Sequence, residues 1–203
     1  MASNLAEWDE KHRAAAGAPP AEPASIVREL LPLLPRGLVL DLACGLGRHA
    51  LLLAAQGQRV VAIDASAVAM ETVEKRAHSA HWEVRHFPCL DDAIRSHAAG
   101  IHLLQANLDE IVIPASSFQL IFCFQYLQRS LFRPIEYALL PGGILLFETF
   151  TRAQLALTGG PRNPEHLLEP GELRTAFPTL HTLFYRELSA GQGIASLAAQ
   201  KPV

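Results

Sequence analysis

One stretch decides the fold of this chain: Val39-Leu40-Asp41-Leu42-Ala43-Cys44-Gly45-Leu46-Gly47-Arg48-His49-Ala50. It begins as an apolar run, breaks at two glycines spaced G-x-G, and resumes as a helical pattern that continues to Gln56. A second apolar run over residues 59–63 ends at Asp64, nineteen residues after Gly45. Strand, glycine turn, helix and strand in this order predict a βαβ unit of a parallel sheet.

Asp64 stands where an acid can bind a ribose. An acidic side chain at the end of the second strand, about 20 residues past the glycine turn, accepts hydrogen bonds from ribose hydroxyls. We therefore expect an adenosine-containing ligand, and a dinucleotide and S-adenosylmethionine are both candidates. Gly45-x-Gly47-x-x-Ala50 satisfies the loose form G-x-G-x-x-G/A, so the glycines alone do not separate the two.

Asp41 separates the two ligands by the sign of its charge. It lies four residues before the first glycine, at the mouth of the turn. A diphosphate needs N–H donors there rather than a carboxylate. S-adenosylmethionine carries an ammonium that suits a carboxylate, and its own carboxylate could use Arg48 or free N–H groups. The charge therefore favours the sulfonium cofactor, and a turn with no ligand is the plain alternative.

Composition predicts one globular domain over residues 1–203 that acts on a small molecule. Half of the residues are apolar and 18% are charged. A net charge of −3 and a pI near 6.3 give no basic footprint for nucleic acid. The three cysteines lack C-x-x-C spacing, which indicates reduced thiols in a cytoplasm. Met1 is not followed by a basic-then-apolar leader, and the sequence has no 18-residue apolar span. We therefore expect a cytoplasmic protein that does not insert into a membrane. We expect a monomer or a homodimer.

The N-terminal 24 residues predict an arm: a helix over 1–16, then a proline-rich linker. Trp8 would anchor this arm to the core or help to close the cofactor site. Ser25 is expected to cap a helix over 26–34, and Ser66 a helix over 67–79 with an inner stripe of Val68, Thr72, Val73 and Arg76. Residues 81–100, in which we expect a short strand (82–85) and a short helix (90–99), read as an insertion.

The rest of the chain predicts a doubly wound, Rossmann-like α/β fold with a mostly parallel sheet and a C-terminal antiparallel hairpin. Strands are expected at 101–106, 118–124 and 144–149, with a helix over 130–140 and a sharp turn at Pro141-Gly142-Gly143. Residues 151–170 predict a lid loop, and a short helix opens at Glu172. Segments 180–188 and 193–199 form the hairpin.

With these pieces in place, the chain resembles the class I S-adenosylmethionine-dependent methyltransferases. The resemblance rests on Asp41 to Gly47, Asp64, Pro141-Gly142-Gly143 and the closing hairpin. Within that class it looks similar to the small bacterial methyltransferases of the tellurite-resistance type, which are thiopurine/tellurite-like. The residues that suggest this subgroup are Trp8-Asp9-Glu10-Lys11, Arg48, Tyr126 to Arg129, Glu148-Thr149-Phe150 and Glu169 to Leu173.

The resemblance implies bacterial methyl transfer from S-adenosylmethionine, with S-adenosylhomocysteine as product. Asp41 would lie near the cofactor's amino group, Asp64 would hold the ribose, and Asn107 with Leu108 would flank adenine. Cys123 and Phe124 would border the methyl group. The full set implied to bind the cofactor is Trp8, Asp41, Ala43, Gly45, Gly47, Arg48, Asp64, Ala65, Asn107, Leu108, Cys123 and Phe124. His12 departs from the tyrosine that relatives often carry, and Gln119 from their aspartate.

Five residues are candidates for the acceptor side, and none of them names the acceptor. Tyr126, Arg129 and Glu148 are catalytic candidates, although Tyr126 and Arg129 also suit a purely structural role. Gln125, Tyr126, Arg129 and His166 are candidates for substrate contacts. The histidines lack metal-ligand spacing, so no metal is expected. Two alternatives stay open: a protein of the same fold that binds the cofactor without transfer, and, more distantly, an NAD(P) oxidoreductase.

Overall fold

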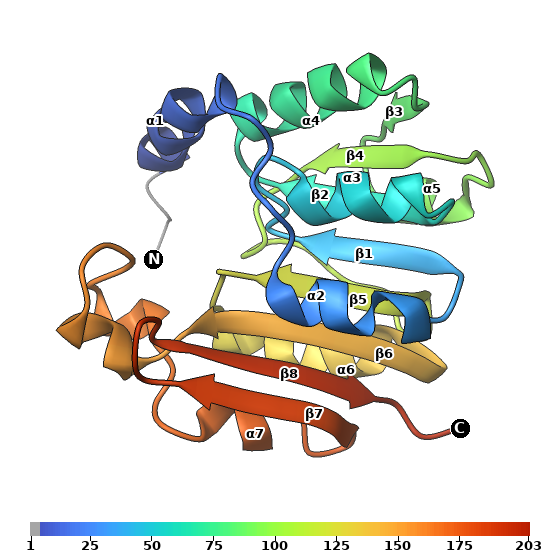
Figure 1. Cartoon of the computed structure of the whole chain (residues 1–203). Coiled ribbons are helices and arrows are strands. Elements are labelled where there is room, and N and C mark those ends of the chain that lie inside the picture. Colours follow the sequence, from blue (N-terminus) through green and yellow to red (C-terminus); the bar gives the residue numbers. More distant parts are fainter. Residues whose placement is uncertain (1–4) are drawn as a thin grey trace. The chain divides into compact units, whose positions relative to one another are not determined.

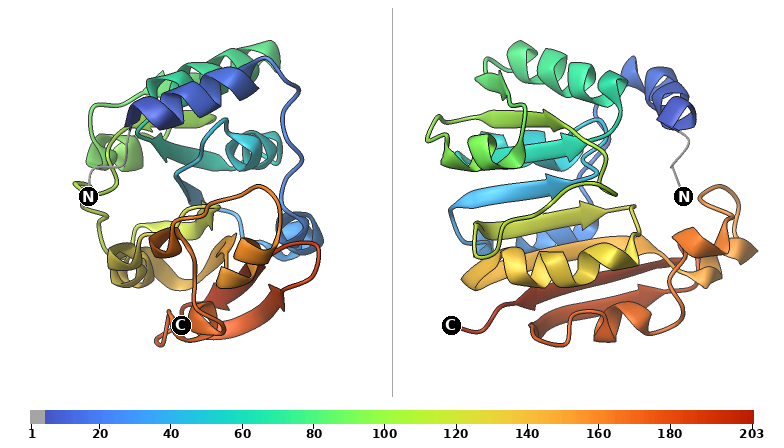
Figure 2. Two further views of the ribbon diagram at one scale, coloured as in Figure 1. Left: turned by 90° about the vertical axis from the view of Figure 1, so that its left-hand side faces the viewer. Right: turned by 180° about the vertical axis from the view of Figure 1, so that it is seen from behind.

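The computed structural model describes residues 5–203, which divide into two units (Figure 1, Figure 2). The first unit runs to Pro32 and continues over Arg36–Val112. The second contains Leu33–Pro35 and Ile113–Val203. Each unit has its own sheet strands and helices, and each is described by itself.

The first unit contains four parallel strands in the order β3-β4-β2-β1. Its elements are α1 (Leu5–Ala16), α2 (Ser25–Leu30), β1 (Leu38–Leu42), α3 (Arg48–Ala55), β2 (Arg59–Asp64), α4 (Ala67–Ser79), β3 (Val84–His86), α5 (Leu90–Arg95) and β4 (Ile101–Gln105). All five residues of β1 are buried, as expected of a parallel strand that is covered on both faces. Figures 1 and 2 show α3 on one face of these strands and α5 on the other.

The second unit contains β5, β6, β8 and β7 in that order, and the last two pairings are antiparallel. Its elements are β5 (Phe118–Phe124), η2 (Arg129–Leu131), α6 (Phe132–Ala138), β6 (Leu139–Phe150), η3 (Arg152–Ala156), η4 (Pro164–His166), α7 (Glu172–Thr175), β7 (His181–Leu188) and β8 (Ile194–Gln200). A short η1 (Leu31–Leu33) ends the α2 segment. Phe132, Phe147 and Phe177 pack together with ring centroids 5.1–5.9 Å apart.

The predicted fold class is confirmed: the sheet is mostly parallel and ends in an antiparallel hairpin. Segment 81–100 supplies the edge strand β3, which pairs with β4, and the helix α5. Ser66 caps α4 as predicted, since its Oγ accepts a hydrogen bond from the N–H of Ala69. The buried residues of α4 are Ala69, Met70, Thr72, Val73 and Ala77, so the predicted stripe was wrong at Val68 and Arg76.

Two local predictions were wrong for identifiable reasons. Ser25 is the first residue of α2 and not its N-cap, because the helix begins one residue earlier than predicted, with the Ala24 carbonyl accepting the N–H groups of Val27 and Arg28. The N–H of Ala24 donates to Nε2 of His49 at 3.2 Å. Pro141-Gly142-Gly143 is part of the long strand β6 rather than a separate turn. Gly142, at φ +74°, allows a bulge that shifts the register between Phe118 and Leu120 of β5.

Ala43 adopts φ +51° at the start of the glycine turn, a conformation that costs a residue with a Cβ about 1 kcal/mol. Ala43→Gly should therefore raise the free energy of unfolding by up to about 1 kcal/mol, measured by urea denaturation. The matched control is Gly47→Ala, because Gly47 has φ +79° and a Cβ there would lie 2.7 Å from Cγ2 of Val73. That variant should be clearly destabilised. A destabilised Ala43→Gly would contradict the strain argument.

Candidate cofactor site

Three N–H groups of the glycine turn between β1 and α3 are bonded within the protein. The N–H of Cys44 donates to the carbonyl of Ile63 at 2.9 Å, and that of Gly47 donates to Cys44 O at 3.0 Å. The N–H of Gly45 donates to Oδ2 of Asp64 at 2.8 Å. These three N–H groups are therefore not available to a ligand unless a bond within the protein is broken.

The carboxylate of Asp64 joins the ends of two strands. Besides Gly45, it accepts the N–H of Ser66 on Oδ1 at 3.0 Å. Asp64 is 9% exposed, so these contacts hold its carboxylate in one orientation at the end of β2. Each carboxylate oxygen has two lone pairs, which leaves room for ribose hydroxyls. This geometry fits the predicted role of Asp64.

Asp41 is a buried carboxylate with an unpaired oxygen. It is 1% exposed, and its Oδ2 has no hydrogen-bond partner. Burial raises the pKa of Asp41 from 3.8 to about 7, against the lowering effects of the nearby Arg48 cation and of a hydrogen bond from the Ala50 N–H. A buried negative charge needs a cation or donors. The site therefore fits the ammonium of S-adenosylmethionine and is unfavourable for a diphosphate.

The N-terminal arm reaches this same unit. Oγ of Ser66 lies 2.5 Å from Oδ1 of Asp9, which attaches α1 to the start of α4. Figure 1 shows α1 beside α4, near the ends of β2 and β4. Trp8 is 39% exposed, its ring tilted against that of His12, with Nζ of Lys11 4.6 Å from the Trp8 centroid. The contribution of Trp8 to a cofactor site stays a prediction.

The residues expected near adenine form a turn after β4. Asn107 is exposed, its amide donates to Oε1 of Glu110 at 3.2 Å, and its Oδ1 accepts the N–H of Asp109 at 3.1 Å. Leu108 is buried at 5% exposure, and the carbonyl of half-buried Ala65 accepts a bond from Gln105. The Asn107 amide is therefore occupied within its own turn and would have to exchange Glu110 for the purine.

In the second unit, β5 is followed by a strained residue. Cys123 and Phe124 are buried, and the exposed Gln125 that follows has φ +56°. Its N–H donates to the carbonyl of Glu148 at 2.7 Å. The buried Glu148 carboxylate accepts a 2.6 Å bond from Oγ of Ser196. A non-glycine residue held in this conformation costs energy, and such strain gathers at functional sites.

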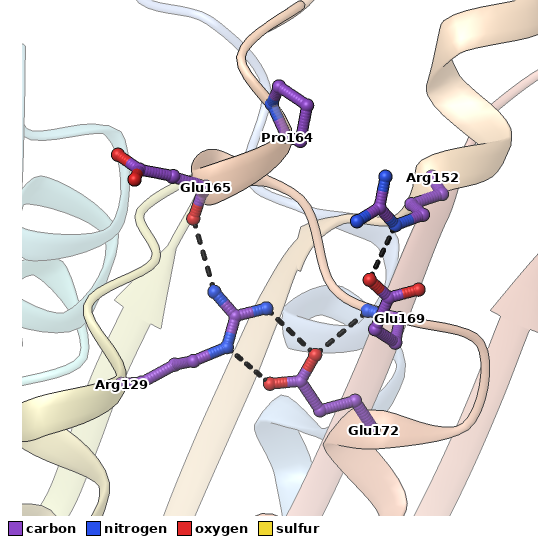
Figure 3. A pocket seen from close by; sticks show the side chains of 6 residues that line it. All are labelled: Arg129, Arg152, Pro164, Glu165, Glu169 and Glu172. Atoms are coloured by element: carbon purple, nitrogen blue, oxygen red, sulfur yellow. Dashed lines mark hydrogen bonds and ion pairs between the residues drawn. The ribbon is translucent and has the colours of Figure 1, made fainter.

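Arg129 clamps the predicted lid instead of standing free (Figure 3). Its Nε and Nη2 donate to the two carboxylate oxygens of Glu172 at 2.6 and 2.8 Å. Nη1 and Nη2 also donate to the carbonyls of Glu165 and Leu167. The pair lines a hollow of about 440 Å³ together with Arg152, Pro164, Glu165 and Glu169. These bonds favour a positioning role for Arg129, and they raise its pKa.

The other acceptor-side candidates take no part in the bonds of that clamp that are described above. The Tyr126 hydroxyl lies 2.6 Å from Oε1 of Gln128. His166 is exposed in η4. Cys44 is buried, and burial raises the pKa of its thiol, which suits a packing residue and not a nucleophile. Within the described residues, no three His, Cys, Asp or Glu side chains could share one metal ion.

Residues 40–147 match the family model described as a methyltransferase domain, which is more than half of the 203 residues. The chain belongs to the methyltransferase domain family. The resemblance to class I S-adenosylmethionine-dependent methyltransferases is thereby confirmed. A comparison with curated proteins finds no match.

Solved structures of this methyltransferase fold cover most of the chain. TehB from Haemophilus influenzae has a TM-score of 0.69 at 16% identity, over 88% of this chain and 62% of that one. An S-adenosylmethionine dependent methyltransferase from Mesorhizobium loti reaches 0.64 at 19% identity, over 88% and 98%. The [4+2]-cyclase SpnF reaches 0.70 at 16% identity, over 98% and 94%. Such identities show the fold alone, so the tellurite-resistance subgroup stays a prediction.

Sequence reasoning missed two features of this methyltransferase domain. The strain at Ala43 and Gln125 is invisible in a residue pattern, because both residue types usually have negative φ. The Asp9–Ser66 contact joins residues 57 positions apart, and the Trp8-Asp9 segment was its only sequence signal.

No helix within residues 5–203 has the length and apolar character needed to span a membrane.

The raised pKa of Asp41 predicts that the free energy of unfolding of the ligand-free methyltransferase domain depends on pH. Between pH 4 and 7 the folded chain keeps a proton that the unfolded chain has lost, so the free energy of unfolding falls as pH rises. Asp41→Asn removes this loss. The difference in unfolding free energy, variant minus wild type, should grow by about 2–3 kcal/mol from pH 5 to pH 8.

The difference between the two chains also cancels the contribution of a second buried group, His49, to the pH dependence of stability. Burial lowers the pKa of His49 to about 3, which makes stability rise with pH up to about 6.5 in both chains equally. Urea titrations of both proteins at four pH values give the difference directly. A difference that stays constant with pH would show that Asp41 is ionised in the fold throughout this range.

Proposed function

We propose that this chain transfers a methyl group from S-adenosylmethionine to a small-molecule acceptor. The observation that carries the proposal is Asp41, a buried carboxylate with an unpaired oxygen beside a glycine turn in a methyltransferase domain. When bound, the cofactor supplies a methyl group already activated by a positively charged sulfur. The net negative charge of the chain supports a small acceptor rather than a nucleic acid.

Five residues of the first unit have a proposed task at the cofactor site. Asp41 balances the ammonium, and Asp64 accepts bonds from the ribose hydroxyls. Gly45, with φ +52°, lets the backbone come close to the methionine part without a Cβ in the way, while the missing Cβ of Gly47, with φ +79°, lets the turn pack against Val73 of α4. Leu108 offers an apolar surface to adenine. These groups bind and orient, which is the main protein contribution to a transfer whose leaving group is neutral.

Glu148 is the residue we propose for handling a proton of the acceptor. A hydroxyl or ammonium acceptor must lose a proton to attack, whereas a soft sulfur, selenium or tellurium nucleophile needs little help. The Glu148 carboxylate is 6% exposed and is oriented by Ser196 at the end of β6. Gln125 is the proposed acceptor contact. Its backbone conformation is strained, and its N–H donates to the Glu148 carbonyl.

A second function, cofactor binding without transfer, is favoured by one comparison. SpnF has the same fold over 98% of this chain and is described as a [4+2]-cyclase. The fold therefore does not by itself secure methyl transfer. A nicotinamide oxidoreductase is the weaker alternative, because a buried carboxylate beside the turn repels a diphosphate.

Transfer of a labelled methyl group to a panel of thiol, halide, tellurite and amine acceptors tests the proposal. We expect turnover with at least one acceptor class. Glu148→Gln should lower kcat/KM at least about tenfold for an amine, with little change for a halide, because a protonated amine must lose a proton to attack whereas a halide has none.

Ser196→Ala is the matched control for that variant, since it removes the partner of Glu148 and keeps the carboxylate. Its loss should be smaller than that of Glu148→Gln. Binding of S-adenosylhomocysteine with no turnover across the whole panel would favour the binding protein over the enzyme.

A further inference from the structure

His12 lies directly over the glycine turn. Its Nε2 is 3.6 Å from the position that a Cβ on Gly45 would occupy. Its Nδ1 is buried and has no hydrogen-bond partner. An imidazole nitrogen that is removed from water without a partner costs free energy. The ring therefore offers polar capacity, beside the turn, that the protein itself does not use.

The arm holds this ring in place through a contact on the same helix. Asp9 precedes His12 by nearly one turn of α1, and its Oδ1 meets Oγ of Ser66. The N–H of Ser66 in turn binds Asp64. The arm is thus joined to the same acid that is proposed to bind ribose. A ligand held by Asp64 and the glycine turn would have α1 beside it (Figure 2).

The amino-acid end of S-adenosylmethionine needs partners of both signs. Asp41 suits its ammonium, but its carboxylate needs donors. The N–H groups of Cys44, Gly45 and Gly47 are already used within the protein. These three N–H groups therefore cannot bind the carboxylate without breaking bonds, and a side-chain donor close to the turn can serve in their place.

We propose that His12 is this donor and binds the carboxylate of the cofactor's amino-acid end. The inference rests on the proposed function, because it assumes that S-adenosylmethionine occupies the turn. It adds a residue from the arm to the site, with the Asp9–Ser66 contact as a positioning device. The arm then recognises the amino-acid end and leaves the nucleoside to Asp64.

Two ligands that differ only at that end separate this role from simple packing. S-adenosylhomocysteine carries the amino acid, and 5′-methylthioadenosine lacks it. In calorimetry, His12→Phe should weaken S-adenosylhomocysteine binding at least about tenfold and change methylthioadenosine binding less than about twofold. His12→Gln, which keeps a donor, should recover part of the loss. Trypsin cleavage at Lys11 and Arg13, unchanged in rate, verifies that the arm stays docked.

Three results would overturn the inference in distinguishable ways. An unchanged S-adenosylhomocysteine affinity in His12→Phe would show that the ring makes no contact with the carboxylate. Equal losses for both ligands would assign His12 a packing role. If neither ligand binds the wild-type chain, the proposed function itself fails, and the role of His12 fails with it.

Discussion

The carboxylate of Asp64 is the point on which the first unit depends. By accepting the N–H groups of Gly45 and Ser66, it ties the turn after β1 to the start of α4. Ser66 extends the connection to Asp9 on the arm. Three segments distant in sequence therefore meet through one acid. Because the carboxylate already carries two charge-dipole bonds, its orientation is set before any ligand arrives, which lowers the cost of ordering a site on binding.

Charge then decides which adenosine-containing ligand suits this frame. Asp41 is buried, its Oδ2 is unpaired, and its pKa is raised to about 7 by burial. The ligand-free fold bears this cost, and a cation beside the carboxylate would relieve it. A site that destabilises its own empty state in this way gains affinity for an ammonium and loses it for a diphosphate. Family membership and the physics of Asp41 thus support the same class of cofactor.

The sequence predicted the parts of the fold that follow from local patterns. Long apolar strands such as 118–124, the turn between β1 and α3, the Ser66 cap and the closing hairpin all have short-range signals, and each was confirmed. The predicted Ser25 cap was wrong because α2 begins one residue earlier, with an N-cap at Ala24 whose N–H is bound by the distant His49. The Arg129–Glu172 clamp and the arm contacts could not be predicted from local patterns, because they join residues far apart in the chain. Backbone strain at Gln125 has no sequence signal at all.

The most direct test of the central claim is a calorimetric titration of the purified chain with S-adenosylhomocysteine and, separately, with NAD and NADP. The account predicts a dissociation constant in roughly the micromolar range for the first ligand and no measurable heat for the dinucleotides. Binding of NAD or NADP with no response to S-adenosylhomocysteine would contradict it.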